Sequence, residues 1–157
     1  MADKAVTQKN MNKKIDYVFA VGRRKQAVAR VRLYKDVKAD AAWKQTPIKK
    51  GEILVNEKLI TEYFPSDVER RMFSEPLRVV NAQNKYALTI RVVGGGKAGQ
   101  LEAVVAGIAN ALAKSDPEEH RPVLKKKGFL TRDARVRERR KVGTGGKSRR
   151  AKQSPKR

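Results

Sequence analysis

The chain has 157 residues with 38 Lys and Arg, 16 Asp and Glu, one His and no Cys, for a formal net charge of +22. This length allows one modest domain with extensions, and the charge far exceeds what solubility requires, which indicates a polyanionic partner. The lack of Cys excludes disulfides, thiolate catalysis and Cys-ligated zinc, and it agrees with a reducing, cytoplasmic environment. One His cannot form a metal site alone, and no apolar run approaches the roughly 18 residues of a membrane span. We therefore expect no metal, no cofactor and no membrane partner.

The positive charge is unevenly distributed along the chain. Residues 17–120 hold 18 basic and 12 acidic side chains, whereas residues 121–157 hold 16 basic and only two acidic ones. A near-normal domain followed by a basic extension is typical of proteins with a nucleic-acid-binding arm. We predict a disordered head over residues 1–16, an RNA-binding α/β domain over 17–130 and a basic RNA-threading tail over 131–157.

The first structured segment is predicted to be a β-hairpin. Tyr17–Val21 is a short apolar run, and Ala27–Tyr34 alternates between an apolar face and a face that carries two Arg. The Gly22–Gln26 segment between them should therefore place three consecutive cations at the hairpin tip. A solvated basic turn is the alternative, but a continuous basic surface favours contact with RNA phosphates. The residues of this expected surface are Arg23, Arg24, Lys25, Arg30 and Arg32.

The next segment is predicted to contain a loop, a strand and a short helix. Lys35–Gly51 lacks periodicity and is expected to be a long loop that carries Trp43. A strand over Glu52–Val55 follows. Asn56 is expected to cap a short helix that ends at Tyr63.

A second helix and two strands are predicted from the pattern that follows. Ser66–Glu69 matches a capping box, so a helix should begin there and end before Pro76. Strands are expected over Leu77–Val80 and Lys85–Val93, on either side of a turn at Asn81–Asn84.

The remaining elements are predicted to be helices. Residues 97–114 have apolar side chains at helical spacing, so this helix should cover the sheet. A last helix over residues 118–127 should end at Gly128, with Lys125–Lys127 opposing the helix dipole. His120 is interpreted as a surface or capping residue. Together the elements define an α+β protein: a single compact domain with a mixed β-sheet covered by helices, plus a long basic C-terminal extension.

A glycine-rich turn, Gly94–Gly99, precedes the long helix. Its G-x-G-x-x-G spacing superficially matches a dinucleotide-binding turn, with Asp116 or Glu118 as the acid, but no second parallel strand precedes that acid. An enzyme that uses this turn is therefore the least favoured of the functional hypotheses, behind the two nucleic-acid-binding ones described below. We interpret the turn as a close helix–sheet contact, so that Val at Gly96 or Gly99 should destabilise the domain. Backbone N–H groups there, with Lys97, could also hold an RNA phosphate.

The tail has almost no apolar content beyond Leu130, so we expect it to be disordered in the free protein and to order only on RNA. Arg predominates over Lys at its start, and the planar guanidinium suits bidentate phosphate contact, which favours RNA binding over a merely solubilising role. The cations expected to contact RNA from residue 125 onward are Lys125, Lys126, Lys127, Arg132, Arg135, Arg137, Arg139, Arg140, Lys141, Lys147, Arg149 and Arg150.

Four motifs together point to one family. They are GRRKQAVARV at Gly22–Val31, ILVN at Ile53–Asn56 followed by Tyr63–Pro65, GGGKAGQ at Gly94–Gln100, and GFLTRDAR at Gly128–Arg135. In this order and spacing they resemble the bacterial-type small-subunit ribosomal protein nine family. The resemblance covers most of the chain from residue 17 to residue 142.

This resemblance implies a non-enzymatic structural protein of the cytoplasmic ribosome. It implies a compact domain in the head of the small subunit, with small-subunit ribosomal RNA and neighbouring ribosomal proteins as partners and no small-molecule substrate. It also implies that the tail reaches the peptidyl-tRNA site, where Lys156 and Arg157 contact the backbone of the tRNA anticodon stem-loop. The chain ends in Gln153–Arg157, which lacks the aromatic residue common in the family but keeps the terminal cations.

A small DNA-compacting protein is the alternative from a different class, because it would be equally basic and equally non-enzymatic. Such a protein would favour Pro- or Lys-rich repeats and an apolar wedge for a kinked minor groove. Neither feature is present in the sequence.

Overall fold

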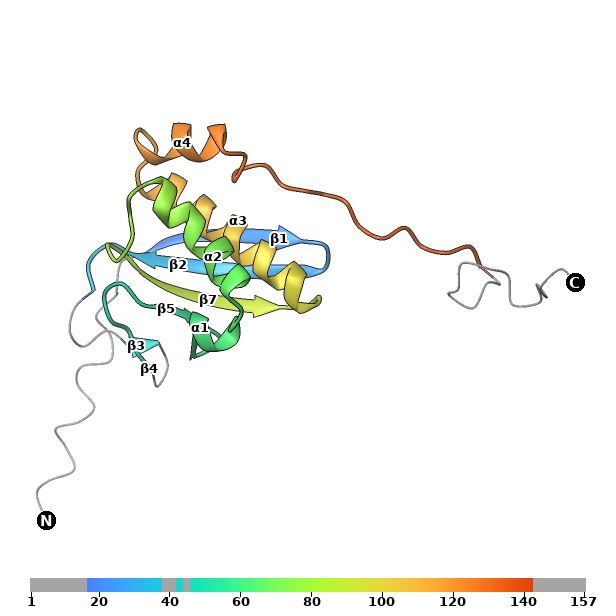
Figure 1. The fold of residues 1–157 in the computed structure, drawn as a ribbon, viewed down its shortest axis with the longest axis horizontal. Helices are drawn as coiled ribbons and strands as arrows, with labels where there is room; N and C mark the ends of the chain where they lie inside the picture. Colours follow the sequence, from blue (N-terminus) through green and yellow to red (C-terminus); the bar gives the residue numbers. More distant parts are fainter. Residues whose placement is uncertain (1–16, 38–41, 44–45, 143–157) are drawn as a thin grey trace, which may run out of the picture.

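The computed structural model describes residues 17–37, 42–43 and 46–142. These residues form a five-stranded mixed sheet of order β1-β2-β7-β5-β6, a two-stranded hairpin, and helices on one side of the sheet (Figure 1). The predicted α+β class and the helix-covered mixed sheet are confirmed. The elements in chain order are β1 (Val18–Arg24), β2 (Ala27–Tyr34), β3 (Ala42–Trp43), β4 (Thr46–Pro47), β5 (Ile53–Val55), β6 (Lys58–Leu59), α1 (Ile60–Tyr63), α2 (Asp67–Val79), β7 (Ala87–Val93), α3 (Lys97–Ser115) and α4 (His120–Lys126).

The buried face of the sheet is built from cross-strand partners. β1 and β2 pair antiparallel with Ala20 opposite Val31, and β2 and β7 pair antiparallel with Val31 opposite Ile90. β5 joins β7 in parallel orientation and places Val55 beside Ile90. These four side chains are at most 1% exposed, so the predicted apolar face of Ala27–Tyr34 lies in the core.

Two glycines let α3 lie directly against β1. A Cβ at Gly22 would overlap the backbone of Ala103 and Gly107, and a Cβ at Gly107 would overlap the side chain of Val31. The helix predicted over residues 97–114 is confirmed, as is its position over the sheet. The close contact itself joins residues far apart in the sequence, so no local pattern indicates it.

The glycine-rich turn lies where the sequence predicts, but the positive φ angles and the lack of space for a Cβ are found at other glycines than expected. Gly94 and Gly95 have φ of +75° and +66°, and a Cβ at either would press on the β1–β2 hairpin. Gly96 has a φ of −100° and open space around an added Cβ, and at Gly99 the nearest atom is 3.6 Å away. The reason predicted for a loss of stability is therefore wrong for Gly96. At Gly99 the φ is not positive, but the glycine is buried against the hairpin, so the predicted close contact is present. The positive φ belongs to Gly94 and Gly95.

α2 is longer than the sequence predicts. The capping box at Ser66–Glu69 is confirmed, but the helix continues through Pro76, so the predicted strand Leu77–Val80 is wrong. The residues Phe73, Pro76 and Leu77 are buried at helical spacing. Packing of this apolar stripe compensates for the backbone hydrogen bond that proline cannot donate.

The predicted capping role of Asn56 is wrong. This residue has a φ of +47°, and its side-chain amide bonds both the N–H and the carbonyl oxygen of Val92, at 3.0 and 3.1 Å. The amide therefore extends the pairing between β5 and β7 at the sheet. The short strand β6 follows, and α1 begins only at Ile60.

The segment predicted as a long loop contains the β3–β4 hairpin, in which Trp43 pairs with Thr46. Trp43 packs against a small apolar cluster that includes Tyr34, Ile48 and Leu54, on the side of the sheet away from α3. Tyr34 lies on the predicted polar face of β2, but this cluster buries it.

α4 has the predicted type and end. Its first turn contains Pro122, and Gly128 follows it with a φ of +77°. The surface position considered for His120 is wrong, because the residue is 7% exposed. Its Nδ1 lies 3.2 Å from the carbonyl oxygen of Leu112 in the last turn of α3, which agrees with the capping role. His120 thus joins α4 to α3.

Residues 131–142 contain no helix or strand, and beyond Arg135 they extend away from the domain (Figure 1). No helix among the described residues has both the length and the apolar character to span a bilayer. The described residues also contain no group of three possible metal ligands of the His, Cys, Asp or Glu types. The predicted head over residues 1–16 and the end of the tail from residue 143 lie outside the described residues.

Candidate nucleic-acid interface

The face of the sheet opposite α3 carries three exposed arginines. Arg30 and Arg32 project from β2 on this face, as the sequence predicts, because they alternate with the buried apolar positions. Arg91 of β7 lies directly opposite Arg30. Among the described residues none of the three has an ion-pair partner. We refer to Arg30, Arg32 and Arg91 as the open-face arginines.

The five cations predicted for the hairpin do not share one surface. β1 extends through Arg24, so the turn consists of Lys25 and Gln26. Neighbouring strand residues point to opposite sides, so Arg23 and Arg24 diverge. Arg23 is exposed at the outer edge of β1, whereas Arg24 is paired with Ala27 on the covered face and its side chain is 12% exposed. The prediction that Arg24 extends the basic face away from the apolar side is therefore wrong.

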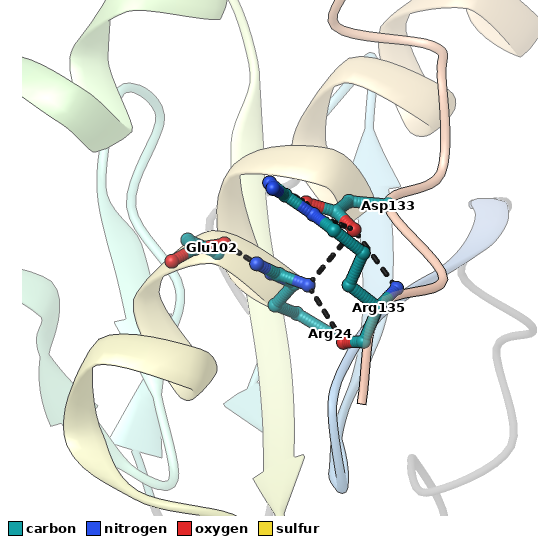
Figure 2. A network of polar contacts seen from close by, with 4 residues as sticks. All are labelled: Arg24, Glu102, Asp133 and Arg135. Atoms are coloured by element: carbon teal, nitrogen blue, oxygen red, sulfur yellow. Dashed lines mark hydrogen bonds and ion pairs between the residues drawn. The ribbon is translucent and has the colours of Figure 1, made fainter. Parts of the chain in front are cut away.

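Arg24 connects three parts of the molecule (Figure 2). Its Nε donates to the carboxylate of Glu102 in α3. Its Nη1 donates to the carbonyl oxygen of Arg135 at 3.0 Å and lies 3.1 Å from Oδ1 of Asp133, both in the extension. We call this group of four residues the tail anchor, because it attaches the beginning of the tail to β1 and α3.

Asp133 is the acceptor at the centre of the tail anchor. The side-chain hydrogen bonds from Arg135, at 2.7 to 3.1 Å, and the backbone N–H of the same residue hold the pKa of the Asp133 carboxyl far below its usual range. The same interaction raises the pKa of the Arg135 guanidinium. Arg135 is exposed, so its ion pair with Asp133 is open to screening by salt.

Asp116, the acidic residue considered for dinucleotide binding, makes hydrogen bonds within the domain instead. Asp116 accepts hydrogen bonds from Lys35 at 3.1 Å and from Tyr86 at 3.0 Å. The hydrogen bond from Lys35 is the main cause of the lowered pKa of Asp116. In the described chain α3 is followed by α4 without a second parallel strand, so the rejection of a dinucleotide fold is confirmed.

The other predicted RNA contacts lie in several separate places. Lys97 is exposed at the first residue of α3, and Lys125–Lys127 are exposed at the C-terminal end of α4. The exposed cations of the extension are Arg132, Arg135, Arg137, Arg139, Arg140 and Lys141. The predicted contacts that lie outside the described residues are Lys147, Arg149, Arg150, Lys156 and Arg157.

Arg91 and Phe19 belong to the open face but were absent from the predicted contacts. Arg91 alternates with Ile90 and Val92 on a predicted strand, so its outward direction is visible in the sequence. Its position opposite Arg30 depends on the β2–β7 register. Phe19 is opposite Arg32 and 46% exposed, although its apolar character alone predicts burial.

An exposed arginine cluster on a sheet, joined to a basic extension, defines a protein that binds a polyanion and has no catalytic constellation among its described residues. Comparison with known proteins gives the family. The chain matches the family described as ribosomal protein S9/S16 over residues 22–157, and it belongs to that family.

Several relatives share most of their length with this chain. The small ribosomal subunit protein uS9 of Leifsonia xyli is 42% identical over 138 residues, which are 88% of this chain and 74% of the relative. The uS9 protein of Maridesulfovibrio salexigens is 41% identical over 131 residues, which are 83% of this chain and 90% of the relative. The chain is therefore a structural protein of the small ribosomal subunit and not an enzyme, and the DNA-compacting alternative is set aside.

Proposed function

We propose that this small-subunit protein binds ribosomal RNA in the head of the subunit, beside neighbouring ribosomal proteins. The domain over residues 17–130 anchors it, and the basic tail over 131–157 threads into folded RNA. The observation that carries the proposal is the pairing of Arg30 directly opposite Arg91. Like charges at opposed strand positions destabilise a sheet, and RNA phosphates would neutralise them.

The geometry at the base of the tail supports a directed extension. The tail anchor ties Asp133 and Arg135 to the domain, and beyond it the described chain continues without secondary structure to residue 142. A fully extended segment of residues 131–142 reaches up to about 40 Å. The remaining residues, ending in Lys156 and Arg157, would contact phosphates of the tRNA anticodon stem-loop at the peptidyl site.

Subunit reconstitution tests the role of the domain in RNA binding. Changing both Arg30→Glu and Arg32→Glu should strongly reduce incorporation into small subunits, because two attractive contacts become repulsive. The fold should remain intact, since both side chains are exposed. The matched control is Arg70→Glu with Arg71→Glu on α2. Incorporation of the open-face variant at the control level would contradict the proposal.

Removal of Lys156 and Arg157 tests the role of the tail in tRNA binding. Folding and assembly should be unchanged, while the affinity of small subunits for tRNA should fall modestly. Two lost phosphate contacts on single-stranded RNA should flatten the slope of log affinity against log salt by up to about 1.4. The loss should be similar for different tRNAs, because phosphate contacts carry no sequence information. Identical salt slopes, or a defect confined to one tRNA species, would refute the tail contact.

A further inference from the structure

A groove of about 700 Å³ lies on the open face of the sheet. The β3–β4 hairpin borders it on one side, and strands β1, β2 and β7 form its floor and walls. All three open-face arginines line it, together with Phe19 and Trp43. Sites for small ligands typically enclose roughly 300–1,000 Å³, so one nucleotide unit fits.

Among the residues that the structure describes, the three arginines of this groove form no ion pair. Arg30 is opposite Arg91, and Arg32 is opposite Phe19 on one side and Thr89 on the other. Among the described lining residues, one acidic side chain, Glu57, stands against three arginines. The ring of Tyr17 lies 4.9 Å from the guanidinium of Arg32 and orients it through a cation–π contact. Convergent guanidinium groups of this kind suit a phosphate backbone.

Two aromatic side chains lie beside these cations. Phe19 is 46% exposed on β1, where it adds nothing to the main core. Trp43 is half-buried, because it packs on the small cluster around Tyr34 while also lining the groove. Proteins that bind single-stranded RNA combine basic grooves with aromatic surfaces on which unstacked bases lie. An acidic protein segment would match the arginines but would leave the aromatic rings without a specific partner.

We propose that this groove binds one unpaired nucleotide of an RNA strand, with its flanking phosphates on the open-face arginines and its base against Trp43 and Phe19. This inference rests on the proposed RNA-binding function and specifies the kind of RNA. Any base offers an aromatic face, so the site tolerates different sequences. Regular duplex RNA is disfavoured, because its bases are already stacked.

The test uses Trp43, which is the only tryptophan of the chain and therefore reports on the groove directly. Its fluorescence should be quenched when the full chain is titrated with a short single-stranded oligoribonucleotide. Inorganic polyphosphate, which has no bases, and a duplex of the same RNA should bind the basic tail with little quenching. Three variants accompany the wild type: Arg91→Gln, Phe19→Leu and, as the matched control on α2, Arg71→Gln.

Arg91→Gln should flatten the slope of log affinity against log salt, measured from the quenching, by about 0.7. Phe19→Leu should lower the affinity for the oligoribonucleotide, measured from the quenching, roughly tenfold, because base stacking on an aromatic ring is lost. The control should match the wild type. Equal quenching by polyphosphate would refute the base contact, and equal behaviour of Arg91→Gln and the control would refute the phosphate contact.

Failure of this inference can be distinguished from failure of the proposed function. If the oligoribonucleotide binds without quenching and the wild type enters subunits normally, the groove proposal is wrong and ribosomal RNA binding stands. If the Arg30 and Arg32 charge reversal enters subunits like its control, the proposed function itself fails. If Arg91→Gln blocks assembly but leaves the quenching unchanged, the face receives a neighbouring protein and the groove proposal is refuted.

Discussion

The open face of the sheet and the base of the tail both contain arginines from the same hairpin, but the two regions use them differently. On the open face, Arg30 lies opposite Arg91 with no carboxylate of the described chain paired to either. At the base of the tail, Arg24 is enclosed between the carboxylates of Glu102 and Asp133. An arginine whose charge is already neutralised inside the protein stabilises structure, whereas an unneutralised cluster is available to an external anion. Charge counting along the sequence cannot separate these two roles.

The largest expected effect comes from disrupting the close contact between β1 and α3, because this contact positions both the open face and the tail anchor. Gly22→Val should lower the free energy of unfolding by about 3 kcal/mol or more, because the side chain overlaps the α3 backbone. Gly96→Ala should cost less, about 0.5–1 kcal/mol, because the position has open space and an extended φ, although Ala is a poorer N-cap than Gly. Denaturant unfolding of both variants measures the difference. Equal stability of the two would show that α3 does not depend on this approach.

A smaller effect should separate the two adjacent arginines of β1. Arg24→Gln should destabilise the domain by about 1–2 kcal/mol, because Glu102 and Asp133 lose their shared partner in a half-buried place. Arg23→Gln should change stability by less than about 0.5 kcal/mol, as is usual for an exposed side chain. Thermal unfolding of both variants tests the comparison. A loss at Arg23 as large as that at Arg24 would remove the distinction between the two regions.

The smallest expected effect is the pH response of the tail anchor. The pKa of Asp133 is lowered in the folded protein. The stabilisation that its ionised carboxylate gives to the tail anchor is therefore complete above the ordinary carboxyl range near pH 4, and it is lost only as the pH falls through the lowered pKa. The tail should therefore keep its position between about pH 8 and pH 4. Because the chain has no Cys, spin labels can be attached at Val68→Cys on α2 and Val136→Cys in the tail, both of which are exposed positions. The distance between the two labels measures the position of the tail.

Asp133→Asn is the matched variant for this measurement. It should broaden the label-to-label distance distribution at neutral pH, because the amide cannot replace the ionised acceptor for Arg24 and Arg135. A wild-type distribution that broadens already near pH 5, or an unchanged distribution in the variant, would show that other contacts hold the tail.

Local patterns predicted much of the fold and part of the candidate interface. The alternation in Ala27–Tyr34, the apolar stripe of α3 and the stop at Gly128 each depend on neighbouring residues, and each is confirmed. The error at Pro76 arose because a proline usually ends a helix, and here the burial of the surrounding stripe outweighs that preference. The disorder of the tail in the free protein and its ordering on RNA both remain predictions, and the contact between Arg24 and Asp133 places only its beginning beside β1.

The sequence by itself determined the charge of this protein and its uneven distribution along the chain, its fold class and its family, because these follow from composition and from short motifs. Only the tertiary structure decided which cations are available to RNA. Register between strands places Arg91 beside Arg30, and the approach of α3 and the tail to β1 encloses Arg24. Both arrangements join residues that are distant in the chain, and their energies depend on pairwise distance and burial, which no local sequence pattern encodes.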